Sequence, residues 1–351
     1  MGRPVHRLPA QRIAGAPVSA PPDLAPLVGI DAIRAAAAVL RGVTLVTPLV
    51  AFGRPQRRQL VKAESLQPIG AFKLRGAYVA VASLSPAERR RGVITYSSGN
   101  HAQGVARAAR LLDAPCVVVM PSDAPAVKRR RVAADGAEIV VVGTASEERR
   151  AVAERLSAER GLVVIPPYDD DRIIAGQGTC GLEIVDAAPD VAAVLVPIGG
   201  GGLASGVAAA VKAIRPTARV IGVEPELAAD ARDSLAAGRI VEWPAELVSR
   251  TIADGTRTQS IGRRPFAHLS RLLDGIVTVS EAEIAAAVRV AAEECRLVLE
   301  PSGALTLAAL RWHATEAGLD AADGPIVAVA SGGNVDPDRY AGYLAAPLPD
   351  D

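Results

Sequence analysis

The sequence predicts an α/β protein in which parallel-type sheets are flanked by helices. Short runs rich in β-branched residues alternate with helical stretches, the pattern of parallel strands joined by crossover helices. The chain has 351 residues and is 50% hydrophobic but only 3% aromatic. Because alanine and valine dominate its apolar part, close-packed helices on a sheet are favoured over a β-sandwich. The length suffices for two domains with a substantial core.

The first series of elements forms a compact block. Helical spacing with charged outer faces indicates three helices, which end near Leu112, Gly136 and Gly161. The two glycines stand where helix C-caps are expected. Strands that we expect to be buried on both faces alternate with these helices, at residues 92–96, 116–120, 138–142 and 162–166.

A second series follows, with helices predicted from Leu203 and near 227–237. Capping boxes at Ser85–Glu88 and Ser280–Glu283 mark two further helix starts. The predicted strands of this series are 192–197, 219–224, 275–279 and 325–330.

The simplest architecture is a small α/β domain, residues 88–167, inserted within a larger domain formed by residues 24–87 and 168–345, with a cleft between them. Residues 1–23 are rich in Pro and Ala and lack the apolar core of a secretory signal. We expect them to form a flexible N-terminal tail.

Composition argues against several function classes. The formal net charge is +1, so no global field favours nucleic acid or an anionic membrane, and the basic run Lys128–Arg131 is interpreted as a solvated helix face. Residues 191–211 carry no charge and are long enough for a bilayer helix. Because Pro197 and four glycines interrupt them, a strand, a glycine loop and a helix are favoured.

The three cysteines have neither metal-ligand spacing nor the pattern of a disulfide framework. We therefore expect small buried hydrophobic side chains in a reducing, cytoplasmic compartment. These residues are Cys116, Cys180 and Cys295.

Lys73 lies in the stretch ESLQPIGAFKLRGAY, among apolar side chains and directly after a Gly-Ala-Phe turn. One interpretation is a helix residue that snorkels to solvent, and the other is an amine kept for covalent chemistry. Apolar surroundings disfavour the ammonium form and lower the pKa of the amine toward reactivity.

The stretch PIGGGGLASG (197–206) predicts an anion site, because a strand, a glycine loop and a helix start bring bare N–H groups and a helix dipole together. It lacks the Gly-Lys-Ser/Thr ending of a P-loop and does not match the dinucleotide fingerprint well. The alternative is a close-packed turn without a ligand.

Two further polar turns follow predicted strands. SSGNHAQG (97–104) places several polar groups at a helix start, where they can hold a carboxylate; an ordinary N-cap is the alternative. In ASGGNVD (330–336), a glycine turn presents Ser331 toward the expected cleft.

Together these motifs give the sequence a specific resemblance. From about residue 24 to 345 it resembles the fold-type II pyridoxal phosphate enzymes, in the threonine/serine dehydratase and serine racemase family. The resemblance implies a two-domain, tryptophan synthase β-like fold with the cofactor in the interdomain cleft, and a homodimer.

The resemblance also implies roles for individual residues. Lys73 would form a Schiff base with the cofactor aldehyde, Asn100 would hydrogen-bond the ring 3-hydroxyl, and Ser331 would contact the pyridine nitrogen. Phe72 and Gly255 would lie near the two ring faces. The phosphate would be held by Gly199, Gly200, Gly201, Gly202 and Leu203, and the substrate carboxylate by Ser97, Ser98, Asn100 and His101.

A metal site is implied by a further match. EPELAAD (224–230) resembles the divalent-metal site of serine racemase and related dehydratases, with Glu224, the Ala228 carbonyl and Asp230 as ligands. Hard oxygen donors suit Mg²⁺ or Ca²⁺. The alternative is an acidic, solvated helix start.

The implied activity is a dehydratase, or ammonia-lyase, that converts a β-hydroxy amino acid such as L-threonine or L-serine to a 2-keto acid and ammonia. Ser98 matches the serine that racemases use as a second proton donor, so serine racemase is an alternative, and 3-hydroxyaspartate dehydratase is another. A binding protein with a degenerate site, or an NAD-binding domain, would be a different class; the first is disfavoured because no expected cofactor residue is missing. Because the chain ends soon after Ser331, we expect no regulatory domain and no feedback control by isoleucine.

Overall fold

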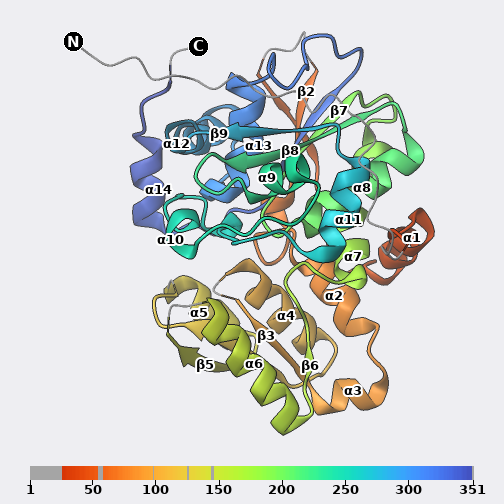
Figure 1. Cartoon of the computed structure of the whole chain (residues 1–351), viewed down its shortest axis with the longest axis vertical. Helices are drawn as coiled ribbons and strands as arrows, with labels where there is room; N and C mark the ends of the chain where they lie inside the picture. The colour runs from red at the N-terminus through yellow and green to blue at the C-terminus, as the bar shows by residue number, and fades with distance from the viewer. Residues whose placement is uncertain (1–25, 54–57, 98, 125, 144–145, 350–351) are drawn as a thin grey trace.

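A six-stranded sheet forms the centre of the larger part of the computed structural model, which describes residues 26–53, 58–97, 99–124, 126–143 and 146–349 (Figure 1). The last strand in the sequence, β10, lies between β2 and β7. All neighbours pair in parallel except β1 and β2, which are antiparallel. In spatial order the strands are β1 (Leu49–Phe52), β2 (Gln59–Ala63), β10 (Ile326–Ala330), β7 (Ala193–Pro197), β8 (Arg219–Pro225) and β9 (Gly275–Val279).

A second, four-stranded sheet is parallel throughout. It lies in the lower part of Figure 1 with α4, α5 and α6 around it. Its spatial order is β5 (Glu138–Val142), β4 (Cys116–Pro121), β3 (Val93–Tyr96) and β6 (Val163–Val164). The predicted boundaries at 87/88 and 167/168 enclose this sheet, and the division into domains stays a prediction.

Helices cover both sheets. The described α-helices are α1 (Ile30–Val39), α2 (Leu74–Ala82), α3 (Pro86–Arg91), α4 (Asn100–Leu111), α5 (Ala126–Ala134), α6 (Ser146–Arg160), α7 (Asp171–Ala187), α8 (Gly202–Ile214), α9 (Asp230–Ala237), α10 (Ala245–Val248), α11 (Arg263–Leu272), α12 (Glu281–Val290), α13 (Pro301–Trp312) and α14 (Pro337–Leu344). Short 3₁₀ turns, η2 (Glu64–Leu66) and η3 (Asp254–Thr256), and a π-helical turn, η4 (Ala291–Cys295), complete them.

The six-stranded sheet is buried on both faces because successive side chains of its strands point into two separate apolar clusters. Leu195 packs in the cluster under α12 and α13. Its neighbours Val194 and Val196 pack in the cluster under α7, α8 and α11. Glycines allow α7 and α8 to approach closely: a Cβ on Gly206 would meet the backbone of Ile174.

Most predicted elements are confirmed. Each strand of the second series begins and ends within one residue of its prediction. Both capping boxes are present, and Gly136 and Gly161 have positive φ, as C-cap glycines do. Residues 191–211 include β7, a glycine turn and most of α8, and within the described ranges no helix has the length and apolar character needed to cross a membrane.

Two predictions about the first series were wrong. β5 is not buried on both faces, because it is an edge strand whose Glu138 and Val141 are exposed. The strand expected at 162–166 is reduced to the two residues of β6, which are half-buried and pair only along β3.

Candidate functional site

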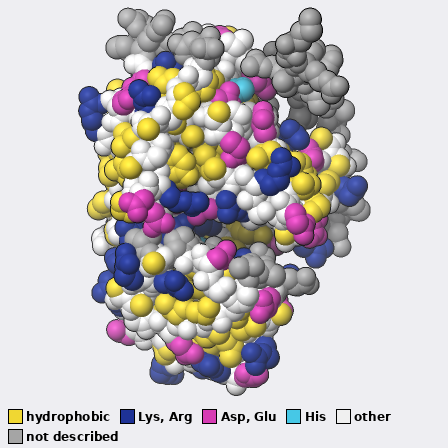
Figure 2. All heavy atoms as spheres, turned by 90° about the vertical axis from the view of Figure 1, so that its left-hand side faces the viewer, with side chains coloured by type: hydrophobic (Ala, Val, Ile, Leu, Met, Phe, Trp, Pro, Cys, Tyr) yellow, Lys and Arg dark blue, Asp and Glu magenta, His cyan; other side chains and the backbone are white. Residues whose placement is uncertain are grey.

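A pocket of about 580 Å³ is lined by residues from around both sheets. Figure 2 shows Lys and Arg side chains gathered where the upper and lower parts of the molecule meet. Ser98 lies outside the described residues, and the predicted metal ligands Glu224, Ala228 and Asp230 do not line the pocket. The predicted cofactor and substrate residues that do line it are Phe72, Lys73, Ser97, Asn100, His101, Gly199, Gly200, Gly201, Gly202, Leu203, Gly255 and Ser331.

Lys73 stands at the start of α2, in the wall of the pocket. Its Nζ donates to the carbonyl of Pro167 at 2.8 Å and lies 5.1 Å from the centre of the Phe72 ring. Burial lowers the pKa of the amine to about 8. The adjacent backbone is fixed, because Phe72 N donates to Ser331 O at 3.0 Å. Lys73 is therefore a basic nitrogen that loses its proton more readily than an ordinary lysine.

The glycine turn between β7 and α8 forms a cradle of backbone N–H groups. Gly201, with φ 90°, is the N-cap of α8, a backbone conformation that favours glycine. Added Cβ atoms would overlap Tyr168 at Gly200 and approach Pro265 Cβ to 2.7 Å at Gly201. Close packing against Tyr168 and Pro265 therefore requires glycine at these two positions. The N-terminus of α8 favours an anion such as a phosphate.

The turn after β3 holds Ser97, Asn100 and His101 at the start of α4. The Ser97 hydroxyl accepts from Gly99 N at 3.2 Å. Burial, and then the nearby Lys73 charge, lower the pKa of His101 to about 3, so its ring is neutral at physiological pH. Its Nε2 lies 3.1 Å from the carbonyl of Ile165, to which it donates. His101 can therefore contribute a polar ring but not a cation to the pocket.

Ser331 follows β10 and lines the pocket, and its carbonyl accepts from the N–H of Phe72. Its hydroxyl donates to Ser302 O at 3.3 Å. Gly255 lies against the same segment, since a Cβ there would approach Ser302 Oγ to 2.6 Å. The pocket wall thus contains a neutral hydroxyl as well as the amine of Lys73.

Sequence reasoning missed seven charged residues in the pocket wall, which are Lys128, Arg149, Arg150, Glu242, Asp254, Arg257 and Glu300. The interpretation of Lys128–Arg131 as a solvated face was wrong for Lys128. This side chain is only 5% exposed, and its Nζ lies 2.7 Å from Asp254 Oδ2 and 3.9 Å from Glu300 Oε2. Burial raises the pKa of Glu300 to about 7, against the opposing effect of Lys128. The available signal was the apolar stretch APAV directly before Lys128.

The profile of the family described as "Pyridoxal-phosphate dependent enzyme" matches residues 40–332. The chain belongs to this family. Its amine, glycine cradle and polar turns are the groups that such a cofactor requires, so the match and the pocket agree.

Similar proteins of this pyridoxal-phosphate-dependent family are named for different activities. The chain is 41% identical over 284 residues to the L-threo-3-hydroxyaspartate ammonia-lyase of Saccharomyces cerevisiae, which covers 81% of this chain and 85% of that protein. The crystal structure of a threonine deaminase from T.th. is 43% identical, has a TM-score of 0.81, and the match covers 88% of this chain and 99% of that one. Maize serine racemase is 35% identical, with a TM-score of 0.85 and coverage of 91% and 97%. These relatives of the chain are therefore named as ammonia-lyases, deaminases and racemases.

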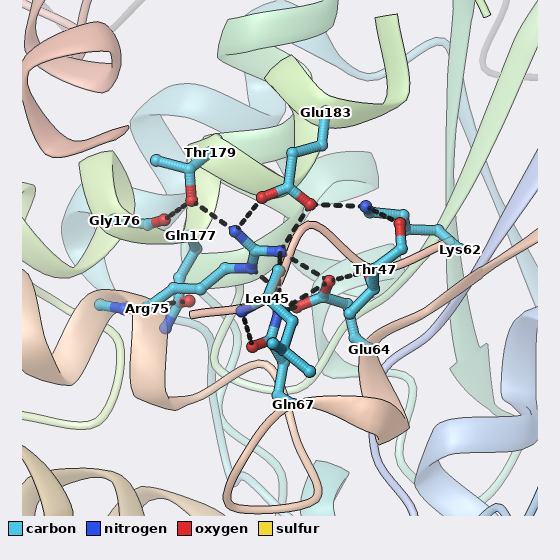
Figure 3. A network of polar contacts seen from close by, with 11 residues as sticks. Leu45, Thr47, Lys62, Glu64, Gln67, Arg75, Gly176, Gln177, Thr179 and Glu183 are labelled. Atoms are coloured by element: carbon cyan, nitrogen blue, oxygen red, sulfur yellow. Dashed lines mark hydrogen bonds and ion pairs between the residues drawn. The ribbon is translucent and has the colours of Figure 1, made fainter. Parts of the chain in front are cut away.

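The lysine-bearing helix of this pyridoxal-phosphate-dependent enzyme is anchored by a buried ionic network (Figure 3). Arg75, two residues after Lys73, donates to both oxygens of Glu64 at 2.7 and 2.8 Å and to both oxygens of Glu183 at 2.6 and 2.8 Å. Lys62 adds a 2.5 Å contact to Glu183. Two cations therefore meet two carboxylates, and the network joins β2, η2, α2 and α7.

The predicted metal ligands lie at the end of β8 and the start of α9. Burial and the neighbouring Asp230 carboxylate raise the pKa of Glu224, and burial raises that of Asp230 to about 7. Glu224 accepts from the N–H groups of Ala231 and Arg232. Both buried oxygens of Asp230 lack a well-aligned hydrogen bond in the part of the chain that is described, although the backbone N–H groups of Asp230 and Ile261 lie near enough to lower its pKa. No third His, Cys, Asp or Glu joins them there. The pair has the chemistry of a hard-cation site that would need carbonyl and water ligands as well.

Proposed function

We propose that this chain is a pyridoxal-phosphate-dependent ammonia-lyase that converts a β-hydroxy amino acid, such as L-threonine or L-serine, to a 2-keto acid and ammonia. The observation that carries the proposal is the amine of Lys73, in the wall of the pocket, with a pKa of about 8 and no carboxylate in ion-pair contact among the described residues. The family and its ammonia-lyase members support the same reaction class.

The residues present fit the cofactor. Gly199–Gly202 and Leu203 would hold its phosphate through backbone N–H groups, because this turn lines the pocket and forms the N-terminus of α8. Asn100 would donate to the ring 3-oxygen, Ser331 would meet the ring nitrogen, and Phe72 and Gly255 would lie near the ring faces. When bound, pyridoxal phosphate supplies an electron sink for the negative charge left on the substrate α-carbon.

Lys73 is proposed as the base that takes the α-proton. Its lowered pKa leaves a usable fraction of neutral amine near pH 7. The turn that holds Ser97, together with the N-terminus of α4, would orient the substrate carboxylate, and Ser98 is proposed there as well. Ser331 is neutral and cannot stabilise a protonated ring nitrogen as a carboxylate would, which favours elimination of the β-hydroxyl. For L-threonine the balanced products are 2-oxobutanoate and ammonium.

A second candidate substrate is 3-hydroxyaspartate. Besides Lys128, the pocket wall includes Arg149, Arg150 and Arg257, and basic side chains favour a substrate with a second carboxylate. The relative from Saccharomyces cerevisiae supports this candidate. Serine racemase is the third candidate, supported by the maize enzyme and by the serine at position 98.

One experiment ranks the three candidates. The protein reconstituted with pyridoxal phosphate is incubated with L-threonine, L-serine and L-threo-3-hydroxyaspartate, and keto acid and D-serine are measured separately. Keto acid as the main product supports the ammonia-lyase, and the fastest substrate gives the preference. Dominant D-serine with little keto acid would replace the lyase with a racemase.

The cofactor link is tested independently of turnover. Borohydride treatment of the reconstituted protein should attach the cofactor to the peptide that contains Lys73, as seen by mass spectrometry. An unmodified Lys73 peptide would refute the proposed function.

We also propose that Glu224, Asp230 and the carbonyl of Ala228 bind Mg²⁺ or Ca²⁺. The buried oxygens of Asp230, which have no well-aligned hydrogen bond among the described residues, support this site.

All three cysteines are free and buried, which supports a reducing compartment such as the cytoplasm. A homodimer is proposed from the family, and light scattering of the purified protein tests it.

A further inference from the structure

Asn100 lies in the middle of a chain of hydrogen bonds that crosses the pocket wall. Its Nδ2 donates to Glu300 Oε1 at 2.5 Å, and its Oδ1 accepts from Asn334 Nδ2 at 2.8 Å. Asn334 Nδ2 also donates to Ile69 O at 2.9 Å, and its Oδ1 accepts from Arg131 Nη1. Two side-chain amides are therefore linked in series.

The charged residues at the two ends of this series of hydrogen bonds, Arg131 and Glu300, determine the orientation of each amide. An arginine only donates and an ionised carboxylate only accepts, whereas an asparagine amide offers one group of each kind. With Arg131 at one end, Asn334 must present its oxygen there and its nitrogen to Asn100. Asn100 Oδ1 then accepts from Asn334, which leaves its nitrogen to donate to Glu300 Oε1. Neither amide can turn over without losing a hydrogen bond.

Helix α5 supplies a cation near each end of the hydrogen-bond series, Arg131 beside Asn334 and Lys128 near Glu300. Lys128 and Arg131 are one turn apart on this helix and so lie on the same side of it. Lys128 lies 3.9 Å from Glu300 Oε2, which helps to keep Glu300 ionised, and is itself held by Asp254 at 2.7 Å. Glu300 is the N-cap of α13, and Asn334 follows β10. This series of hydrogen bonds therefore connects α5 to α13 and to the segment after β10.

We propose that Glu300 and Asn334 are positioning residues that fix the amide of Asn100 so that its second N–H faces the cofactor ring 3-oxygen. This inference rests on the proposed function, in which Asn100 donates to that oxygen. Asn100 Nδ2 carries two hydrogens, of which Glu300 takes one, and Asn100 lines the pocket. A reversed amide would present its oxygen to the cofactor oxygen, and the two acceptors would repel each other.

The test uses the protein reconstituted with pyridoxal phosphate. Asn334→Asp keeps the size of the side chain but cannot donate to Asn100 Oδ1, and it attracts Asn100 Nδ2 instead. We expect cofactor affinity about 10- to 100-fold weaker, as for one lost hydrogen bond to a charged group, and a shift of the cofactor absorption band to shorter wavelength. Glu300→Gln should change both in the same direction but less, because glutamine can still accept. Glu159→Gln, which pairs with Arg155 on the exposed face of α6, is the control for the loss of one carboxylate.

A double-mutant cycle separates positioning from a general effect on folding. In an Asn100→Ala background, Asn334→Asp should leave cofactor affinity and the absorption band unchanged. An effect that persists in full in that background would overturn the inference, as would an Asn334→Asp protein with the affinity and spectrum of the wild type. Thermal melts of all variants show how much of each is folded. A wild-type chain that takes up no pyridoxal phosphate would overturn both this inference and the proposed function, and that result is visible before any variant is made.

Discussion

Lys73 and Arg75 are two residues apart at the start of one helix, yet their surroundings differ completely. Arg75 is fully buried and faces two carboxylates, so its charge is balanced inside the protein. Lys73 has a backbone carbonyl and an aromatic ring beside its amine, and within the described ranges it forms no ion pair. Burial with partners gives a fixed structural cation, whereas burial without them lowers the pKa and leaves a reactive base.

The same contrast separates other buried charges of the molecule. Lys62, Glu64 and Glu183 complete the network around Arg75. The buried oxygens of Asp230 instead have no well-aligned hydrogen bond in the described structure, and burial raises the pKa of this carboxyl to about 7. A buried charge without a charged partner is where the proposed ligands, the cofactor aldehyde at Lys73 and a metal ion at Asp230, are expected.

The largest expected effect comes from Lys73→Met. Because this change removes the proposed base, we expect keto-acid formation to fall about 10⁴-fold. The free energy of unfolding of the cofactor-free protein should change by no more than about 1 kcal/mol, because no ion pair is broken. Lys212→Met, on α8 and outside the pocket lining, is the control for turnover only, because it breaks the ion pair with Asp274. Turnover by Lys73→Met within tenfold of the wild type would contradict the role.

Arg75→Met should produce the opposite result. It leaves Glu64 and Glu183 buried with only Lys62 to balance them, so the free energy of unfolding should fall by about 3–5 kcal/mol. Urea denaturation of the cofactor-free proteins measures this at one pH. Arg75→Lys keeps the charge but loses the two-pronged contacts, and we expect an intermediate loss. If Arg75→Met were as stable as Lys73→Met, the contrast between the two residues would be wrong.

A divalent cation should stabilise the protein by binding at the proposed site of Glu224 and Asp230. At 100 times its Kd, Mg²⁺ or Ca²⁺ should add about 2.7 kcal/mol to the free energy of unfolding. Melting temperatures in EDTA and in excess metal measure the difference. Asp230→Asn should abolish it, and an equal response in that variant would place the cation elsewhere.

The smallest effect is a pH dependence of Lys73 itself. In cofactor-free protein, borohydride trapping of pyridoxal phosphate on Lys73 requires the neutral amine. The rate should rise about tenfold per pH unit up to about pH 8 and then level off. Since the unfolded amine binds its proton more tightly, this group also makes the folded state more stable as pH rises from about 8 to 10.5. Free lysine treated in parallel corrects for the reagent, and a rate that still climbs above pH 9 would show an ordinary amine.

Much of the fold was predictable because its signals are local. The strands of the large sheet are continuous apolar runs, and the capping boxes and C-cap glycines act within a few residues. Edge effects were not predictable: whether Glu138 is buried depends on which strand lies beside β5, and none lies on its outer side in the described sheet.

The pocket was predictable only in part, for a related reason. Lys73 and the glycine turn have local motifs, but the partners that set their surroundings are distant in sequence. Arg75 meets Glu183 across 108 residues, and Asn100 meets Glu300 across 200. The burial of Lys128 likewise depends on Asp254, 126 residues away. No periodicity or spacing carries such pairings.

The central place of β10 has a consequence for how the protein is made. During synthesis β2 and β7 emerge from the ribosome long before residues 326–330. Each of these strands therefore has an unpaired edge until β10 inserts between them. Ser331, whose carbonyl fixes Phe72 beside the reactive lysine, emerges at the same late moment. The large sheet and the wall around Lys73 are therefore complete only after residues 326–331 have been synthesised.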